Sequence, residues 1–423
     1  MVRKVVLDNG VRVLTEEIPH VRSVSLGVWV NVGSRDESDH NNGISHFIEH
    51  MMFKGTKKRT AKEIAESLDA VGGQINAFTT KEYTCYHTKV LDEHIDLAIE
   101  VVSDMLFGSL FAPEDIEREK NVIVEEIKMY EDAPDEMVHD VLTGSMWQTH
   151  SLGRPIIGNE EIVRNVDRST LLDFYEQHYR CGDMVISCAG NIKHEQVVEK
   201  LRAAFEHLPA ANGPRLYTAP RPVTEAVCRQ KDTEQVHLCV GTEGLRLDDD
   251  DAYVMQVINT VLGGGLSSRL FQKIREERGL VYTVFSYHSS YHDTGLFCVY
   301  AGLSSANANQ VLQIVMDELN ELKVNGVGET ELKRTKDQLK GSFLLSLENV
   351  NTRMSRLGKS ELYLGRVTTP DEVVERLQAV TGDQIKRVAG EMFNADRFSL
   401  ATIGQWCDYD GWETALTRLK SSQ

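Results

Sequence analysis

Residues 46–50 have the sequence His-Phe-Ile-Glu-His. If this segment is helical, His46 and His50 are one turn apart and their imidazoles point to the same side of the helix. Two neutral imidazoles in that relation can bind one zinc ion, and Glu49 between them can accept a proton from a water molecule beside the ion. The spacing therefore predicts a catalytic metal site. A helix whose two histidines make ordinary hydrogen bonds remains the alternative.

A catalytic zinc site needs a third protein ligand, and residues 113–130 offer two candidates. Pro113 and the acidic residues after it are typical of a helix start. The apolar spacing predicts an inward stripe made of Ile116, Glu119, Ile123, Glu126 and Tyr130, with Val122 and Ile127 beside it. Two unpaired buried carboxylates would be costly, and a cation would offset that cost. We predict Glu126 as the third ligand and Glu119 as a residue that orients a ligand, unless both carboxylates are solvated.

With these residues placed, the chain resembles the inverzincin zinc peptidases, the family of pitrilysin, insulin-degrading enzyme and mitochondrial processing peptidase. In length it is most similar to bacterial relatives of the processing-peptidase β subunit. The family's third ligand is a glutamate about 76 residues after the second histidine, and Glu126 lies 76 residues after His50. A further family glutamate, seven residues earlier, corresponds to Glu119.

Two more stretches are similar to that family. Residues 72–79, Gly-Gly-Gln-Ile-Asn-Ala-Phe-Thr, resemble the segment that leads into its active-site edge strand. A peptide could add to such an edge as a strand, and the predicted contacts are Asn76, Ala77, Phe78 and Thr79. Residues 263–270, Gly-Gly-Gly-Leu-Ser-Ser-Arg-Leu, resemble a second-domain loop. Arg275 and Tyr282 match the family's arginine–tyrosine pair, which implies that they act on the substrate, with Tyr282 as the transition-state donor.

The resemblance implies a zinc-dependent endopeptidase with one Zn²⁺ per chain and Glu49 as general base. Its substrates would be extended peptides or unfolded, presequence-like segments. Family members of this length work as two subunits that close like a clamshell. The chain is therefore expected to form a homodimer in which Arg275 and Tyr282 serve the partner's zinc. Two alternatives remain: a catalytically silent scaffold or partner subunit, and a protease that needs a separate non-catalytic chain.

Composition narrows the classes of partner. The chain has 46 Lys and Arg against 64 Asp and Glu, a net charge of −18, which argues against nucleic-acid binding. Acidic charge would attract basic peptides if it lined a cavity, but it can also serve solubility alone. We find no apolar run long enough to span a membrane. The seven cysteines are odd in number and scattered, without a CxxC pair, and predict reduced thiols in a cytoplasmic protein.

The length of 423 residues predicts two domains. Four of the nine prolines lie between residues 209 and 222, which predicts a linker at 211–222 between a catalytic, zinc-binding domain, 1–210, and a C-terminal domain, 223–423. The halves look like diverged copies, because 114–120 parallels 330–336 and 166–190 parallels 380–404. In the second copy the metal motif faces Met255, Ile258 and Asn259, and Glu126 faces Ser342, so no ligand remains. Coincidental similarity of helical hairpins is the alternative.

Strand and helix patterns occur in both halves. Predicted strands include 24–32, 84–90, 184–189, 237–242, 283–288 and 296–303. Predicted helices include 61–71, 93–107, 113–130, 168–178, 307–322 and 328–347. Because the two kinds of element do not alternate simply, we expect an α+β fold of two homologous α/β-layered domains of about 210 residues each, rather than a parallel doubly wound sheet.

Overall fold

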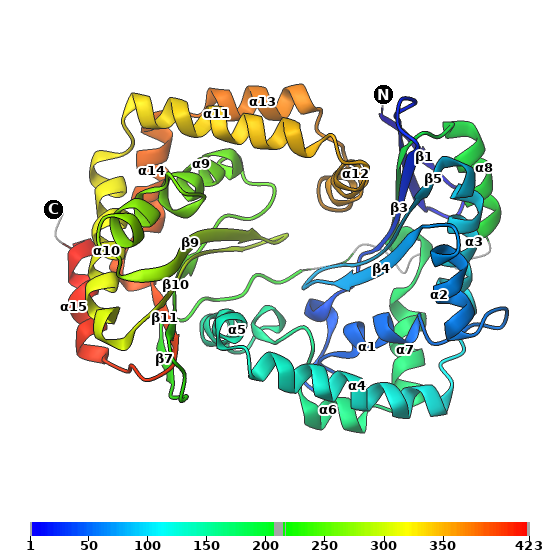
Figure 1. Cartoon of the computed structure of the whole chain (residues 1–423), viewed down its shortest axis with the longest axis horizontal. Coiled ribbons are helices and arrows are strands. Elements are labelled where there is room, and N and C mark those ends of the chain that lie inside the picture. The colour runs from blue at the N-terminus through cyan, green and yellow to red at the C-terminus, as the bar shows by residue number, and fades with distance from the viewer. Residues whose placement is uncertain (1, 207–214, 216, 421–423) are drawn as a thin grey trace. The chain divides into compact units, whose positions relative to one another are not determined.

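The computed structural model describes residues 2–206, 215 and 217–420. They form two compact units (Figure 1). The first consists of Met1–Lys128, Arg154–Leu216 and Leu345–Val367, and the second of Met129–Gly153, Tyr217–Leu344 and Thr368–Gln423. Each unit therefore includes one segment from the other half of the chain. The predicted division of the chain at residues 211–222 assigns these two segments to the other domain in each case. Residues 211–214 and 216 of that linker lie outside the described residues.

The first unit is built on a six-stranded sheet in the order β1-β2-β6-β3-β5-β4. The strands are β1 (Val2–Val6), β2 (Arg12–Glu17), β3 (Ser23–Val30), β4 (Gln74–Thr79), β5 (Thr84–Leu91) and β6 (Met184–Gly190). Only β2 and β6 run parallel among these pairs, and β4 forms one edge, antiparallel to β5.

Helices cover both faces of this sheet. One face shares a large apolar core with α1 (Ile44–Met51), α2 (Ala61–Asp69), α3 (Ile95–Gly108), α4 (Pro113–Glu131), α6 (Glu160–Asn165), α7 (Arg168–His178) and α8 (His194–Phe205). The other face is covered by α12 (Val350–Leu364), whose Met354 and Leu357 pack in a second apolar cluster with Trp29 and Val185 of the sheet. The sheet therefore lies between two helical layers.

Close approach of α12 depends on Gly358. A Cβ atom at this position would lie 2.1 Å from Nε1 of Trp29, a distance that real atoms do not tolerate. Trp29 is itself fully buried and donates a hydrogen bond from Nε1 to Ser187 Oγ at 2.8 Å. Ion pairs tie the helix down as well, since the buried Glu361 accepts from Lys4 at 2.6 Å. The helix α12 is thus an integral layer of the first unit.

The second unit has a five-stranded sheet in the order β7-β11-β8-β10-β9. The strands are β7 (Ala226–Arg229), β8 (Val236–Glu243), β9 (Val281–Ser290), β10 (Gly295–Leu303) and β11 (Ser399–Ile403). One face packs against α5 (Pro134–Met146) through Val141 and Leu142. The remaining helices of this unit are α9 (Ala252–Gly263), α10 (Ala308–Asn325), α11 (Glu329–Ser346), α13 (Pro370–Ala379), α14 (Gly382–Met392) and α15 (Tyr409–Lys420).

The two sheets have the same topology. The order β2-β6-β3-β5-β4 corresponds to β7-β11-β8-β10-β9, with the parallel pair at the same place and antiparallel pairs elsewhere. Helix α5 holds the same place in the chain order as α12, and each covers the sheet of the other half. The predicted α+β fold with two related domains is confirmed, as are all the predicted elements above, with ends shifted by up to three residues. Helices α5 and α12 were not predicted.

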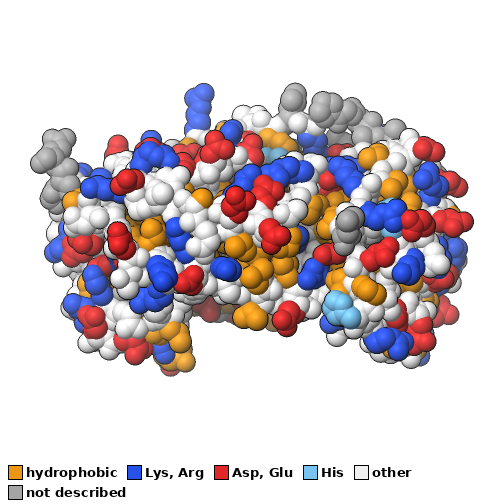
Figure 2. Space-filling model, turned by 90° about the horizontal axis from the view of Figure 1, so that it is seen from above, with side chains coloured by type: hydrophobic (Ala, Val, Ile, Leu, Met, Phe, Trp, Pro, Cys, Tyr) orange, Lys and Arg blue, Asp and Glu red, His pale blue; other side chains and the backbone are white. Residues whose placement is uncertain are grey.

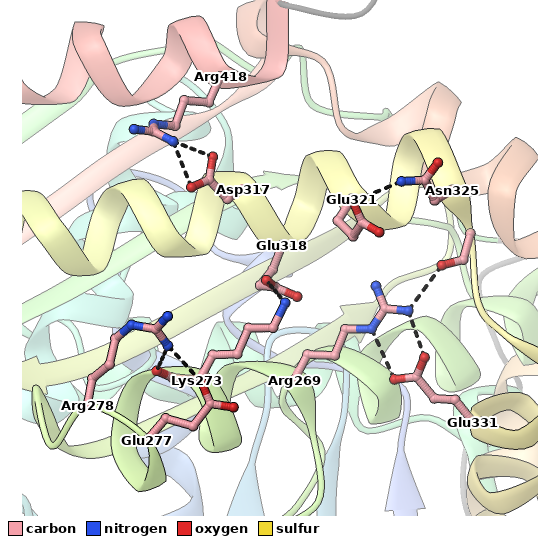
Figure 3. A network of polar contacts seen from close by, with 11 residues as sticks. Arg269, Lys273, Glu277, Arg278, Asp317, Glu318, Glu321, Asn325, Glu331 and Arg418 are labelled. Carbon is pink, nitrogen blue, oxygen red and sulfur yellow. Dashed lines mark hydrogen bonds and ion pairs between the residues drawn. The ribbon is translucent and has the colours of Figure 1, made fainter.

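The predicted second-domain loop, residues 263–270, leads into a helical turn, Phe271–Glu276. Its Arg269 makes two hydrogen bonds to Glu331 on α11, at 3.0 and 2.7 Å, and a third to the carbonyl of Gly326 at 3.1 Å (Figure 3). In the same network Lys273 of the turn pairs with the buried Glu318 of α10. These charged contacts fasten the loop and the turn to two helices.

Charges of both signs are interspersed over the face seen in Figure 2, without a large area of a single sign. The excess of acidic residues therefore does not form one acidic patch on this face. In the part of the chain that the structure describes, every helix is too short or too polar to cross a membrane.

Candidate metal centre

Helix α1 carries the His-Phe-Ile-Glu-His motif, and a buried glutamate holds its first turn. Glu37 accepts hydrogen bonds from the backbone N–H of Gly43 at 2.8 Å, from that of Ser45 at 2.9 Å and from the Asn42 side chain at 2.8 Å. Such a carboxylate satisfies amide groups that a helix start leaves without partners. Burial raises the pKa of Glu37, although the three hydrogen bonds favour its ionised form.

The side chains of His46, His50 and Glu126 meet between α1 and α4. The two Nε2 atoms are 3.2 Å apart, and the carboxylate oxygens of Glu126 lie 3.7 Å from His46 Nε2 and 3.5 Å from His50 Nε2. A tetrahedral zinc ion with bonds of about 2.0–2.1 Å would place its ligand atoms about 3.3–3.4 Å apart. The three donors therefore fit a zinc ion both in chemistry and in spacing.

The surroundings keep both imidazoles suited to metal binding. Burial, with a smaller contribution from His50, lowers the pKa of His46 to about 3, so this ring is neutral at physiological pH. His50 Nδ1 lies 2.8 Å from Glu119, whose other oxygen accepts from Lys54 at 2.7 Å. Burial opposes ionisation of Glu119, but the hydrogen bonds with His50 and Lys54 outweigh it and lower its pKa. Glu119 thus orients the His50 ring so that Nε2 faces the other donors.

Glu49 projects from the same helix toward the edge strand. Its Oε2 accepts a hydrogen bond of 2.5 Å from the hydroxyl of Thr79, the last residue of β4. Burial raises the pKa of Glu49 and the nearby Glu126 adds to this, while Thr79 and His50 offset part of the effect. A carboxylate with a raised pKa is closer to the working range of a general base than an exposed one.

The inner stripe of α4 differs from the predicted one. Glu119 is buried among Ile116, Ile123 and Ile127, whereas Val122 is 49% exposed and the Glu126 side chain is 44% exposed. The predicted placement of Val122 beside the core is therefore wrong. Successive residues lie about 100° apart around a helix, so Val122 points away from the buried Ile123 and faces outward. Glu126 lies at the border of the stripe, where it reaches the histidines.

The predicted peptide-binding residues lie on β4, which pairs with β5 alone among the described strands. Asn76 is exposed, and its Oδ1 accepts from the backbone N–H of Ala77 at 2.8 Å. The Phe78 ring contacts the Trp29 ring at a centroid distance of 6.1 Å. A pocket beside β4 and β5 is lined in part by Asn76, His87 and Asn349. The Thr79 hydroxyl donates to Glu49, and the predicted contact of Thr79 with a peptide stays a prediction.

Arg275 and Tyr282 are neighbours in the second unit. The Arg275 guanidinium lies 5.3 Å from the centre of the Tyr282 ring and 4.8 Å from that of Phe271. Tyr282 is 73% exposed, so its hydroxyl is available to a ligand. The second unit has Met255, Ile258 and Asn259 on α9, where the first has its motif, and Ser342 on α11. These four positions carry no histidine or carboxylate.

Three residues of the centre were missed in the sequence. Lys54 and Thr79 depend on contacts between segments distant in the chain, whereas Glu37 contacts the start of α1 only a few residues further on. The one available signal was local, since Glu37 precedes the Asn-Asn-Gly sequence at which α1 begins. A carboxylate just before a helix start is a common partner of its free amides.

These features define a class of protein: two α+β units of one topology, of which the first carries a His-x-x-Glu-His helix with a glutamate from a second helix. Residues 12–160 match the family model described as Insulinase (Peptidase family M16). Residues 165–339 match the model described as Peptidase M16 inactive domain. The chain belongs to peptidase family M16, and the predicted resemblance to inverzincin peptidases is confirmed.

Relatives of similar length extend along nearly the whole chain. A Bacillus subtilis protein described as an uncharacterized zinc protease is 46% identical over 95% of this chain and 98% of its own length. A Streptomyces coelicolor protein with the same description is 44% identical over 95% of this chain and 89% of its own length.

Solved structures share the fold. A Pseudomonas fluorescens structure described as a peptidase M16 inactive domain has a TM-score of 0.90 at 20% identity, covering 96% of this chain and 98% of its own. A protease from Helicobacter pylori has a TM-score of 0.88, also at 20% identity, covering 96% and 99%.

Proposed function

We propose that the chain is a zinc-dependent endopeptidase that hydrolyses peptide bonds in extended peptides or unfolded segments. The observation that carries the proposal is the meeting of His46, His50 and Glu126 at ligand spacing, with Glu49 beside them. The description of two close relatives as zinc proteases supports the same reading of the site. One Zn²⁺ per chain would be bound by these three residues.

The residues of the centre divide the chemistry among them. When bound, zinc would supply a Lewis acid that lowers the pKa of water toward neutrality. Thr79 holds Oε2 of Glu49, so we assign Oε1 the task of accepting the proton of the attacking water and passing it to the leaving amine. Glu119 and Lys54 keep the His50 ring in place during this transfer.

The edge strand β4 supports a substrate bound as an added strand. Its free side would make main-chain hydrogen bonds to an extended peptide, which gives affinity with weak sequence preference. Because β4 ends at Thr79, and Thr79 holds Glu49, a peptide aligned along this strand would run toward the catalytic base. Folded proteins lack a free extended segment and would be poor substrates.

We further propose a homodimer in which Arg275 and Tyr282 of one subunit complete the centre of the other. The exposure of Tyr282 and its contact with Arg275 support an available pair. In this arrangement Tyr282 donates to the oxyanion that develops on the scissile carbonyl. The cytoplasmic location expected from the cysteines also remains a prediction.

The test is cleavage of an unstructured, arginine-containing fluorogenic peptide by the full-length protein and by Glu49→Gln, with zinc content measured for both. We expect the variant to retain zinc and to lose activity by about 100-fold or more, since a general base contributes about 10²–10⁴. If both proteins hold zinc and neither cleaves, the scaffold or partner-subunit alternative replaces the proposal. Undiminished activity in Glu49→Gln would remove Glu49 as the base.

A further inference from the structure

A second group of metal-binding side chains lies away from the catalytic centre, inside the second unit. His139 on α5, Cys239 on β8 and Cys298 on β10 each place one donor atom within 4.8 Å of the other two. Cys239 Sγ is 3.4 Å from His139 Nδ1. Both cysteines are fully buried, while His139 is half-buried. None of these residues has a part in the proposed peptidase chemistry.

Two side chains compete for one ring nitrogen in this group. The Tyr287 hydroxyl lies 2.8 Å from the same Nδ1 atom that Cys239 approaches. A ring nitrogen has either one lone pair or one N–H, so it cannot make good hydrogen bonds to a thiol and a phenol together. A cation among the sulfur, nitrogen and oxygen atoms would satisfy several of them at once.

The spacing suits a metal ion bound by thiolates. With Zn–S bonds of about 2.3 Å and Zn–N bonds of about 2.0–2.1 Å, a sulfur and a nitrogen ligand of one tetrahedral ion lie about 3.6 Å apart. The observed distance of 3.4 Å between Cys239 Sγ and His139 Nδ1 is close to this value. The Tyr287 hydroxyl lies 2.8 Å from His139 Nδ1, beside these donors.

The strand register explains why the cysteines meet without being placed for a disulfide. Cys239 is opposite Tyr300, and Cys298 is opposite Gly241, so the two cysteines are diagonal neighbours on one face of the sheet. Such diagonal pairs are about 7–8 Å apart, beyond the roughly 7 Å at which a disulfide closes without backbone movement. A metal ion between the two sulfur atoms can bridge this distance, whereas a disulfide bond cannot.

We propose that His139, Cys239 and Cys298 form a second, structural metal site for a thiophilic d10 ion, Zn²⁺ or Cu⁺. Thiolate ligands favour these ions over Mg²⁺ or Ca²⁺. Binding converts both thiols to thiolates and releases two protons. The site fastens α5, the helix that the first half of the chain contributes, to β8 and β10 of the second sheet. This assignment goes beyond the peptidase function and does not depend on it.

The experiment uses Co²⁺ as a probe, because thiolate ligation produces an intense charge-transfer absorption that histidine and carboxylate ligands do not. The full-length chain is first changed by His46→Ala to weaken the catalytic centre, and is then titrated with Co²⁺ under reducing, anaerobic conditions. We expect about one Co²⁺ per chain with thiolate charge transfer. Adding Cys239→Ala or Cys298→Ala should abolish this absorption.

The matched control is Cys188→Ala, which removes an equally buried strand cysteine from the first unit and should leave the absorption unchanged. A folded His46→Ala protein without charge transfer overturns the proposal, and this result needs no cysteine variant to fold. So does absorption that persists when both Cys239 and Cys298 are alanine, or a Cys239–Cys298 disulfide in the protein as purified. Zinc or copper that remains in His46→Ala protein purified without chelator, and that is lost when Cys239 and Cys298 are also alanine, supports it and names the ion.

Discussion

Glu125 and Glu126 are neighbours in the chain with different surroundings. Glu126 reaches both imidazoles, whereas the exposed Glu125 pairs with Lys128 at 2.8 Å. Adjacent residues on a helix point about 100° apart, so only one of the two can face the histidines. Two consecutive glutamates therefore have different roles, one beside the histidines and one in a surface ion pair.

We expect Glu126→Gln to weaken zinc binding by more than about 100-fold and to abolish peptide cleavage, because an amide replaces an anionic ligand. Glu125→Gln changes charge equally and should leave both properties near wild type. Zinc affinity by competition with a chelator, and cleavage of the fluorogenic peptide, check the pair. Equal losses in both variants would show a general effect of charge and not ligation.

One partly buried histidine should control part of the pH dependence of stability. Burial, followed by Arg215 and Arg180, lowers the pKa of His178 to about 4. Because the unfolded chain, with a pKa of about 6.5, binds this proton more readily, the free energy of unfolding falls as pH drops through the window from about 6.5 to 4.

His178→Gln should therefore reduce the loss of unfolding free energy between pH 7.5 and 5 by about 1–2 kcal/mol. Urea unfolding at the two pH values measures the difference. His20→Gln, a change at an exposed position, provides the control and should follow the wild type. An unchanged slope in His178→Gln would show that this ring is protonated in the folded state.

At the scale of helices and strands, the packing of α12 rests on Gly358. Helix α11 offers a contrasting position, Gly341, where an added Cβ atom would meet nothing within 4 Å. Gly→Ala in a helix interior favours the helix by about 1 kcal/mol when there is room. Both glycines lie in helices, so the space around the added methyl group, and not helix propensity, decides the different effects of alanine at the two positions.

Gly341→Ala should raise the free energy of unfolding by up to about 1 kcal/mol, whereas Gly358→Ala should lower it by about 1–3 kcal/mol, because the methyl group overlaps Trp29. Thermal and urea unfolding of the two variants test the difference. A stabilised Gly358→Ala protein would mean that α12 does not pack on this sheet as described.

The sequence predicted the elements better than their partners. Apolar periodicity marks α4 and the strands locally, and the one-turn spacing of His46 and His50 marks the centre. The apolar stripe of a helix, however, does not indicate which sheet the helix covers. The sequence therefore contains no local signal that α5 packs on the second sheet and α12 on the first. Thr79 and Lys54 were likewise invisible, since each acts on a residue far along the chain.

At the scale of the whole molecule, the proposed dimer can be tested by mixing inactive variants. Glu49→Gln lacks the base and Tyr282→Phe lacks the donor. If each centre uses the partner's Tyr282, random mixed dimers contain one intact centre, and the mixture should recover about a quarter of wild-type activity. If a centre uses Tyr282 of its own chain, mixing recovers nothing. Size-exclusion chromatography before and after mixing monitors subunit exchange.

The exchange of α5 and α12 bears on how the polypeptide can be divided. A fragment that stops near residue 210 keeps α5 but leaves the Trp29 face of its sheet bare, and the complementary fragment keeps α12 without a cover for Cys239 and its neighbours. Bare apolar faces promote aggregation. If the two fragments are produced together, each carries the helix that covers the other's sheet. The fold is therefore suited to reassembly from two separately encoded fragments, whereas neither fragment alone should be stable.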